Sequence, residues 1–470
     1  MSWIDRLKPR FGAAKQKPAV SALNGAGGPP TPATRAGRAA AKAARAAGFP
    51  RFHATAGDQL DPFSADEFGV VRLKLRNAYT PAQPITDRWM FAGRIDILTM
   101  AIRAIEDERL HTIIYGQRGI GKTSLLHVLT QAAREARYLV AYVSCGADAT
   151  FDETFRSVAA EIPLRFHEAY GPTSSQAEKG ATVADLLPSV GVSPRLASDL
   201  CTKVAGTRVL VVLDEFDRCE STEFRRSVAE FLKNLSDRSV RVQLVIAGVA
   251  SNLEELLEPG AMIQRSVVAL EVPKMTTEEI GQLVRNGQAV SGLTFDEAAM
   301  TTLVAAANGL PYLASLLCQH AGLSALADAR LTVGESDVLA AITEALHEMK
   351  GRVPRRALAE IARCMRDGAY DVLGPLSGVA QLSNGQFSAN DIAAAFPGVT
   401  DGAARSLVDR LAESGILIER RIDEFGDHFR FVDQNVLPYL WLLSAQAQFA
   451  ARSTPRAATL SPSTDDRARV

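Results

Sequence analysis

Residues 111–123 read His-Thr-Ile-Ile-Tyr-Gly-Gln-Arg-Gly-Ile-Gly-Lys-Thr. The mostly apolar or β-branched start predicts a buried strand over His111–Tyr115. The remaining eight residues fit the pattern G-x-x-x-x-G-K-[ST] at every specified position, and the apolar spacing from Thr123 to about Arg134 predicts a helix directly after them. A strand, a glycine-rich loop and a helix in that order are typical of a site that binds a phosphate group.

The loop residues have separate expected roles in binding a nucleotide. Glycines allow the turns with positive φ that bring several N–H groups onto one phosphate, and the helix N-terminus adds positive charge there. The Lys122 ammonium is expected on the β- and γ-phosphates and the Thr123 hydroxyl on Mg²⁺. The alternative, a chance match, is disfavoured by the flanking strand and helix. The expected nucleotide-binding residues here are Gly116, Gln117, Arg118, Gly119, Ile120, Gly121, Lys122, Thr123 and Ser124.

A second apolar strand, predicted over Val209–Leu213, is followed by two carboxylates, Asp214 and Glu215. Charges are costly inside a buried parallel strand, so this pair is expected at the carboxyl edge of the sheet, where ligands bind. Asp214 is placed to hold Mg²⁺, and Glu215 is placed to orient and deprotonate an attacking water. The alternative is that both are ordinary acids at the start of a helix predicted over Phe216–Leu232.

Strands alternate with helices through the middle of the chain. Further strands are predicted over Leu139–Val143, Val242–Ala247 and Ser266–Val272, and helical periods separate most of them. This alternation predicts an α/β fold with a parallel sheet covered on both faces. From Thr276 to about Met349 the pattern is helical only.

Charge and cysteine content exclude several classes of protein. Residues 1–57 carry ten Lys or Arg and one acid, whereas the rest of the chain carries 42 basic and 52 acidic residues. The mildly acidic body argues against a general nucleic-acid-binding surface, though not against a local patch. The five cysteines lie far apart, which disfavours a zinc ribbon or a disulfide scaffold and favours reduced thiols in a cytoplasmic protein. No apolar run approaches the ~20 residues that span a bilayer.

Taken together, residues 91–345 resemble the AAA+ ATPases, near their initiator-type and STAND-like branch. A glutamate beside the magnesium aspartate, with an extra strand inserted, resembles the additional-strand catalytic-glutamate type of P-loop NTPase rather than the kinase or GTPase type. The run Asn77–Ser124 is also similar to a group of bacterial ATP-binding proteins. The segments that carry the AAA+ resemblance are Phe91-Ala92-Gly93-Arg94 before a helix predicted over Ile95–Glu106, Gly116–Thr123, Leu213-Asp214-Glu215, Val245–Asn252 and Gly309-Leu310-Pro311.

The resemblance implies ATP and Mg²⁺ as cofactors and adds four groups to the site. Arg94 and Pro311 would border the adenine and ribose, or belong to plain turns. Ser251 or Asn252, after a fourth strand lying between the first and third, would sense the γ-phosphate or cap a helix. Arg265 would reach the γ-phosphate of a neighbour in a homo-oligomer, or pair with a nearby glutamate. AAA+ lids often carry an arginine that Pro311–His320 lacks, which favours slow, switch-like turnover.

The C-terminal part resembles a winged helix. Helices are predicted over Ala357–Arg366, Phe387–Phe396 and Thr400–Ser414, then strands over Ile416–Arg421 and His428–Val432 and a helix over Val436–Leu443. Residues 351–445 hold ten arginines and twelve acids, which favours a protein contact over DNA. The expected organisation is a disordered basic tail (1–57), a linker (58–90), the ATPase core (91–274), a helical lid (275–349), the winged helix (351–445) and a disordered tail (446–470).

Two functions follow from this organisation. The first is an ATP-hydrolysing switch whose nucleotide state controls the winged helix and an unknown protein partner. The alternative is a DNA-associated ATPase, initiator- or loader-like, that binds duplex DNA through the winged helix and the basic tail.

Overall fold

The computed structural model describes residues 67–85, 88–170, 179–189, 191–238, 241–250, 256, 265–383, 385–422 and 426–453. Contacts divide the chain into two units, Met1–Val70 and Val71–Val470. All contacts given below lie within residues 71–470. The expected disordered tail 1–57 and residues 454–470 of the expected tail 446–470 lie outside the described residues.

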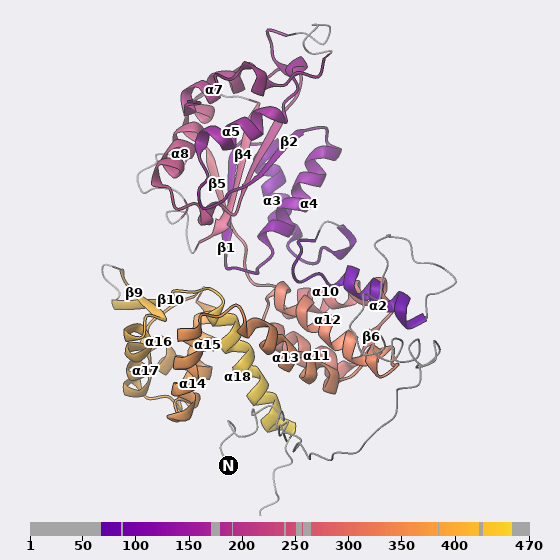
Figure 1. Ribbon diagram of the computed structural model, residues 1–470, viewed down its shortest axis with the longest axis vertical. Helices are drawn as coiled ribbons and strands as arrows, with labels where there is room; N and C mark the ends of the chain where they lie inside the picture. Colours follow the sequence, from indigo (N-terminus) through magenta and orange to yellow (C-terminus); the bar gives the residue numbers. More distant parts are fainter. Residues whose placement is uncertain are drawn as a thin grey trace, which may run out of the picture. The chain divides into compact units, whose positions relative to one another are not determined.

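A five-stranded parallel sheet forms the core, with the strand order β2-β3-β4-β1-β5 (Figure 1). All five predicted strands are confirmed to within two residues at each end, and the fourth lies between the first and third, as expected. Because parallel strands end at the same edge, the loop after β1 and the acids after β3 open onto one side of the sheet. The strands are β1 (His111–Gly116), β2 (Leu139–Ser144), β3 (Val209–Asp214), β4 (Val242–Val249) and β5 (Val267–Glu271).

Helices cover both faces of this sheet, which explains why the central strands are apolar throughout. On one face lie α3 (Ile95–Glu106) and α4 (Lys122–Glu135) (Figure 1). On the other lie α5 (Phe151–Ala160), α7 (Pro194–Thr202) and α8 (Thr222–Asp237). The aromatic rings of Phe155 and Phe231 join α5 to α8 with 5.5 Å between their centroids. The predicted α/β fold class is therefore confirmed.

The helix after β3 begins later than predicted. Instead of one helix over Phe216–Leu232, the chain makes a 3-10 turn at Phe216–Arg218 and starts α8 only at Thr222. The Ser221 hydroxyl caps α8 by accepting a hydrogen bond from Phe224 N at 3.2 Å. This prediction was wrong because the turn places Glu215 in a left-handed conformation, φ 55°, which apolar periodicity does not report.

Four helices follow the sheet and pack on one another, and this bundle is called the lid below. They are α10 (Thr277–Ser291), α11 (Glu297–Ala307), α12 (Pro311–Ala327) and α13 (Glu335–Lys350). Two short strands, β6 (Thr294–Phe295) and β7 (Thr332–Val333), pair in parallel between them. The buried Asp337 carboxylate binds Arg330 at 2.7 Å and ties the β7 turn to α13.

Part of the expected linker 58–90 is a helix whose end packs on this lid. Helix α2 (Glu67–Ala78) ends beside Tyr79, which is 1% exposed. The Tyr79 hydroxyl donates to Val284 O at 2.7 Å, and Gln319 Nε2 donates to Tyr79 O at 2.8 Å. Residues 80–85 are thereby fixed beside the lid, and a short 3-10 turn, η2 (Arg88–Met90), follows before α3.

Residues 355–453 form the C-terminal module, which contains a three-stranded antiparallel sheet of order β8-β10-β9. Its predicted helices and hairpin are present, but α15 was not predicted, since Gly374, Pro375 and Gly378 read as helix breakers. Helix α18 continues to Ser453, so part of the expected tail 446–470 is helical. The elements are α14 (Arg355–Arg366), α15 (Tyr370–Leu382), β8 (Gln386–Phe387), α16 (Ala389–Ala395), α17 (Asp401–Glu413), β9 (Leu417–Ile422), β10 (Gly426–Phe431) and α18 (Val436–Ser453).

All five cysteines are buried and unpaired. Among the described helices, none combines the length and the apolar character needed to cross a bilayer.

We predict that Gly287→Ala loosens the segment before the core. A Cβ at Gly287 would lie 2.1 Å from Tyr79 Cζ, so the ring must move, at a cost of about 1–3 kcal/mol for overpacking. The melting temperature should fall, and proteolysis around residues 79–85 should speed up. Gly281→Ala, in the same helix, is the matched control, because its Cβ would meet only the flexible end of Arg285. Equal melting temperatures for the two variants would contradict this packing.

Candidate nucleotide site

The loop between β1 and α4 turns through three glycines with positive φ. The φ angles are 148° at Gly116, 73° at Gly119 and 93° at Gly121, which residues with a side chain rarely adopt. At Gly121 a Cβ would also lie 2.7 Å from Arg94 Nη1. Glycine is therefore required at this position both by the backbone angle and by the space behind the loop.

Lys122 brings a buried positive charge into the curve of this loop. Its Nζ donates to Gly116 O and to Gln117 O, both at 2.9 Å, and the residue is 9% exposed. Burial lowers the pKa of Lys122 to about 8, although the Asp217 and Asp214 carboxylates favour the charged form. An ammonium held this way is poised to gain from an anionic ligand, because a phosphate would replace neutral carbonyls as its partner.

Asp214 ends β3 with its carboxylate held in one orientation. Its Oδ1 accepts from Glu215 N at 2.8 Å, and its Oδ2 accepts from the Tyr142 hydroxyl at 2.6 Å. Tyr142 lies on β2, and its ring stacks on His127 of α4 with 5.2 Å between centroids. Burial and this bond to Asp214 raise the pKa of Tyr142. The aspartate is therefore positioned by two strands and one helix.

Glu215 follows directly and is anchored through one of its two oxygens. Its Oε2 accepts from the Ser144 hydroxyl at 2.9 Å and from Arg218 Nη1 at 2.8 Å. The side chain is 40% exposed, so Oε1 can still accept a proton from water. The sequence did not predict the roles of Tyr142 and Ser144, because their partners are distant in the chain. It did not predict that of Arg218, because Arg218 lies in a turn that the pattern indicated as helix.

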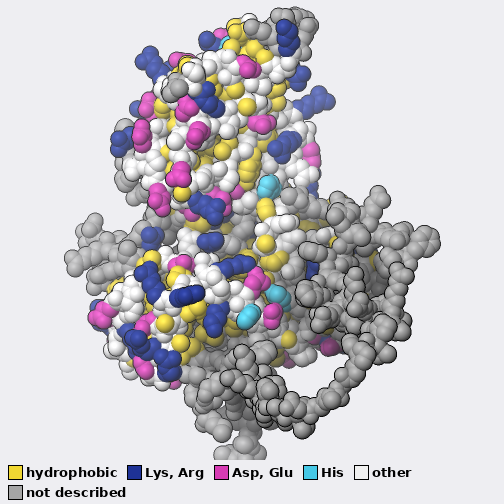
Figure 2. All heavy atoms as spheres, viewed as in Figure 1, with side chains coloured by type: hydrophobic (Ala, Val, Ile, Leu, Met, Phe, Trp, Pro, Cys, Tyr) yellow, Lys and Arg dark blue, Asp and Glu magenta, His cyan; other side chains and the backbone are white. Residues whose placement is uncertain are grey.

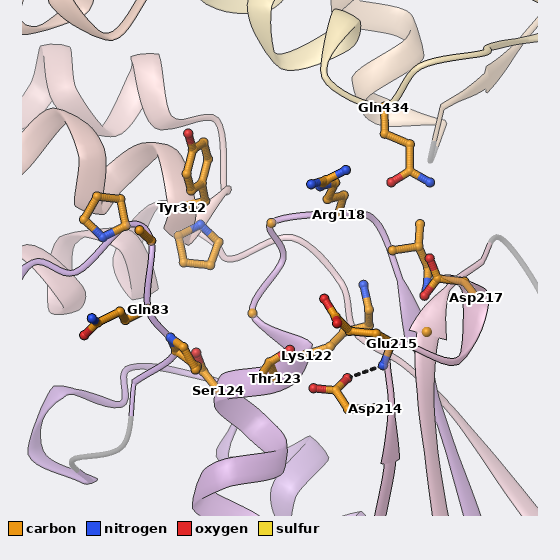
Figure 3. Close-up of a pocket in the computed structure, with 18 of the residues that line it drawn as sticks. Gln83, Arg118, Lys122, Thr123, Ser124, Asp214, Glu215, Asp217, Tyr312 and Gln434 are labelled. Atoms are coloured by element: carbon orange, nitrogen blue, oxygen red, sulfur yellow. Dashed lines mark hydrogen bonds between the residues drawn. The ribbon is translucent and has the colours of Figure 1, made fainter. Parts of the chain in front are cut away.

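These side chains face a cavity of about 620 Å³ (Figure 3). In Figure 3, Lys122, Thr123 and Glu215 point into the same space, with Arg118 between Tyr312 and Gln434 at the opposite side. The cavity is lined by Thr80, Pro81, Ala82, Gln83, Pro84, Ile85, Arg118, Gly119, Gly121, Lys122, Thr123, Ser124, Asp214, Glu215, Asp217, Arg218, Gly248, Val249, Pro311, Tyr312, Ser315, Val432, Asp433, Gln434 and Asn435.

One side of the cavity is lined mainly by apolar residues from two distant parts of the chain. Residues 80–85 and the start of α12, with Pro311 and Tyr312, line it. Ile85 N donates to Ser124 Oγ at 3.0 Å, which ties the first segment to the phosphate loop. The sequence predicted Pro311 here but treated 80–85 as linker, since proline-rich composition is typical of both a linker and a rigid wall.

The other expected site residues differ in whether they line the cavity. Arg94 is 7% exposed and lies behind the loop, where its N and Nη2 donate to Glu279 Oε1 at 3.0 Å and Pro273 O at 3.3 Å. Burial lowers the pKa of Arg94 to about 10. Arg94 therefore supports the loop and does not line the cavity, and Ile120 is buried. Arg265 is exposed just before β5, while Ser251 and Asn252 lie outside the described residues.

The donor set suits a hard divalent cation. The Thr123 hydroxyl and the Asp214 carboxylate both line the cavity and supply oxygen ligands, which Mg²⁺ prefers. Three cationic side chains, Arg118, Lys122 and Arg218, line it together with four carboxylates. A triphosphate would therefore enter a site with no excess of protein positive charge, and a bound cation would balance it.

Comparisons with known proteins agree with this fold. Residues 105–257 match a family model described as an AAA domain. This span contains the phosphate loop and the acidic pair, and the sheet with its covering helices has the AAA+ P-loop NTPase fold. A search of curated proteins found no match to the sequence.

Solved structures show a distant likeness. RuvB of Thermotoga maritima, a Holliday junction branch migration motor, is 15% identical, with a TM-score of 0.38 over 74% of this chain and 97% of that one. Cdc6p of Pyrobaculum aerophilum is 13% identical, with a TM-score of 0.44 over 79% and 98%. The Orc1 protein of Aeropyrum pernix, solved with DNA, is 18% identical, with a TM-score of 0.39 over 81% and 97%. Sequence identities and TM-scores this low show nothing about the activity of this chain.

We predict that Tyr142→Phe weakens the dependence of nucleotide binding on Mg²⁺. Without the hydroxyl, Asp214 Oδ2 loses its 2.6 Å bond and the carboxylate can rotate. Loss of such an outer partner typically costs about 10–100-fold in metal affinity. Titration of a fluorescent ATP analogue against Mg²⁺ should show the Mg²⁺ midpoint raised by about tenfold, with Mg²⁺-free binding unchanged. Tyr138→Phe, which removes a hydroxyl bonded to Arg208, should leave the midpoint unchanged.

Proposed function

We propose that this chain binds ATP with Mg²⁺ and hydrolyses it to ADP and phosphate. The observation that carries the proposal is the meeting, in one cavity, of the phosphate loop with the two carboxylates at the end of β3. Lys122 and the loop N–H groups suit a triphosphate, and Glu215 stands on the same side of the sheet. A binding protein without hydrolysis would need no anchored carboxylate beside an open polar space.

The proposed reaction is attack of water on the γ-phosphorus. A water oxygen forms a new P–O bond as the bond to the bridging β–γ oxygen breaks, and ADP carries away the electron pair. Glu215 Oε1 accepts the proton of the attacking water, because Oε2 is already bonded to Ser144 and Arg218. Lys122 stabilises the negative charge that develops on the phosphate oxygens. Mg²⁺ held by Thr123 and Asp214 would supply further charge neutralisation.

The mainly apolar side of the cavity supports a purine nucleotide as ligand. A base would lie between residues 80–85 and the Pro311–Tyr312 start of α12. No Asn-Lys-x-Asp sequence, the pattern that reads guanine, occurs in the chain. We therefore favour ATP over GTP.

We also propose that the C-terminal module responds to the nucleotide and acts through a protein partner. The order α15-β8-α16-α17-β9-β10, with its three-stranded sheet, supports a winged helix. Its loop at Asp433–Asn435 lines the cavity, and Gln434 faces Arg118 there (Figure 3). A ligand reaching this loop would change the balance between two arrangements of the module.

One buried residue joins this module to the rest of the site. Gln381, at the end of α15, is 1% exposed, and its Oε1 accepts from Lys274 Nζ at 2.7 Å. Lys274 lies between β5 and the lid, and burial lowers its pKa to about 8. The carbonyl oxygen of Gln381 lies 3.5 Å from Nε2 of Gln117 in the phosphate loop. The side chain of Gln381 thus contacts the segment before the lid and its backbone contacts the phosphate loop, so three parts of the chain meet at one residue.

Arg265 supports assembly into a homo-oligomer. It is exposed and lies two residues before β5, which is one of the two edge strands of the sheet. From that edge we propose that it contributes charge to the γ-phosphate in a neighbouring copy.

We predict that Glu215→Gln separates binding from hydrolysis. The amide cannot accept a proton, so the steady-state hydrolysis rate should fall by roughly 100-fold or more, a loss typical of a general base. ATP affinity should change less than threefold, since Gln keeps the size of the side chain. Lys122→Ala is the blank and should lose nucleotide binding itself. A Glu215→Gln rate close to the wild-type rate would refute Glu215 as the base.

Gln381→Ala should uncouple the module while leaving ATP affinity within about threefold. We expect ATP to change hydrogen exchange in β10 and the start of α18 of the wild-type chain, and this change to disappear in the variant. Coupling of this kind is typically worth about 1–3 kcal/mol. Gln446→Ala is the matched control, because Gln446 joins the module to Thr343 of the lid, at 2.8 Å, and touches no part of the cavity. Loss of the ATP response in both variants would contradict a specific role for Gln381.

A further inference from the structure

Helix α14 of the C-terminal module has two faces of opposite character. One face is buried and consists of Ala357, Glu360, Ile361 and Cys364. The other is exposed and carries four arginines, Arg355, Arg356, Arg363 and Arg366. The buried Glu360 pairs with Arg410 of α17, which fixes the helix to the rest of the module.

The four arginines form a compact strip. At about 100° per residue, they fall within a sector of about 100° around the helix axis. With a rise of about 1.5 Å per residue, Arg355 and Arg366 are separated by about 16 Å along that axis. Ala359 and Ala362, both exposed, lie at or beside this sector. The strip combines long basic side chains with short neighbours that let a second molecule approach closely.

Few acidic groups offset this charge. The one carboxylate of α14 is Glu360, which is buried and bonds Arg410 Nε at 2.7 Å and Arg363 Nη1 at 3.2 Å. Arg355, Arg356 and Arg366 form no ion pair with a carboxylate of the described residues. Figure 2 shows Lys and Arg side chains gathered over the region where Figure 1 places α14 and α17.

Helix α17, which directly precedes the hairpin of β9 and β10, differs in charge. Its exposed charged residues are three acids, Asp401, Asp409 and Glu413, and one base, Arg405. Such a face is unsuited to a phosphate surface. The basic character of the module is therefore carried by α14, although the module as a whole has more acids than bases.

We propose that the α14 strip binds the phosphate backbone of duplex DNA without reading its sequence. Arginine forks match phosphate oxygens in pairs, and a span of about 16 Å covers two or more phosphates along one strand. A protein partner is less well suited, because interface cores are built from aromatic and large apolar anchors, and this strip exposes only arginine and alanine. The proposal goes beyond ATP hydrolysis and does not depend on it.

The test measures the salt dependence of DNA binding by the full chain. Fluorescence anisotropy with a labelled 25-base-pair duplex of arbitrary sequence would be recorded over about 50–200 mM NaCl. The variant is Arg355→Gln/Arg356→Gln/Arg366→Gln, which removes the three arginines that have no ion pair. We expect its affinity at 100 mM NaCl to fall by about tenfold or more. The slope of log K against log salt should become shallower by about 2 to 3, near 0.9 per lost phosphate contact.

Two controls separate this strip from general charge and from folding. Arg134→Gln/Lys233→Gln removes two exposed cations of α4 and α8 in the ATPase core and should leave the slope unchanged. Arg355→Lys/Arg356→Lys/Arg366→Lys keeps the charge and should keep most of the slope. Unchanged melting temperatures would show that every variant is folded.

Each outcome decides the proposal. An unchanged slope in the triple glutamine variant would overturn it and place DNA binding elsewhere in the chain. No DNA binding by the wild-type chain, or an equal loss in the core control, would overturn it too. Binding of polyglutamate but not DNA would instead point to an acidic protein partner. Since no nucleotide is needed, an inactive ATPase site would leave the result unaffected.

Discussion

The buried ammonium of Lys122, at the edge of the parallel sheet, constrains the arrangement of the groups around it. Lys122 is almost fully enclosed, and burial disfavours its charge. Two loop carbonyls and the nearby carboxylates Asp214 and Asp217 compensate in part. Only a sheet whose first and third strands end at the same edge brings these groups together, and β4 between them sets their separation. The phosphate loop, the acids and the cavity all follow from this one requirement.

Residues distant in the chain orient the two acids and form the wall of the cavity. β2 supplies both Tyr142 and Ser144, two residues apart on the same face of the strand, and these bond Asp214 and Glu215 respectively. A strand that holds no candidate catalytic residue thus orients the two that β3 provides. On the opposite side, Tyr79 fixes residues 80–85 against the lid, so the mainly apolar side of the cavity depends on packing far from the phosphate loop.

The C-terminal module combines two features that its composition conceals. Its net acidity suggests a protein contact, yet tertiary packing buries or pairs Glu360 and Asp367 and leaves the arginines of α14 exposed. The same module lines the cavity through Asp433–Asn435 and contacts Lys274, between β5 and the lid, through Gln381. The helix that we propose binds a polyanion and the loop that lines the proposed nucleotide site are therefore parts of one module.

The sequence by itself determined the core strands, the phosphate loop, the acidic pair and the helix bounds of α3, because local spacing and periodicity specify strands, loops and helix caps. It did not determine Tyr142, Ser144, Arg218 or residues 80–85, whose roles arise from contacts across long stretches of chain or from the turn after Glu215. It placed Arg94 at the nucleotide, whereas folding puts this residue behind Gly121, since the αL turn at Arg94 directs the side chain under the loop. It missed α15, because packing of that helix against α18 overrides the weak helix propensity of Gly374 and Pro375. Neighbouring residues determine the local turns, caps and motifs, whereas contacts between distant side chains form only when the apolar faces of the helices and strands pack together.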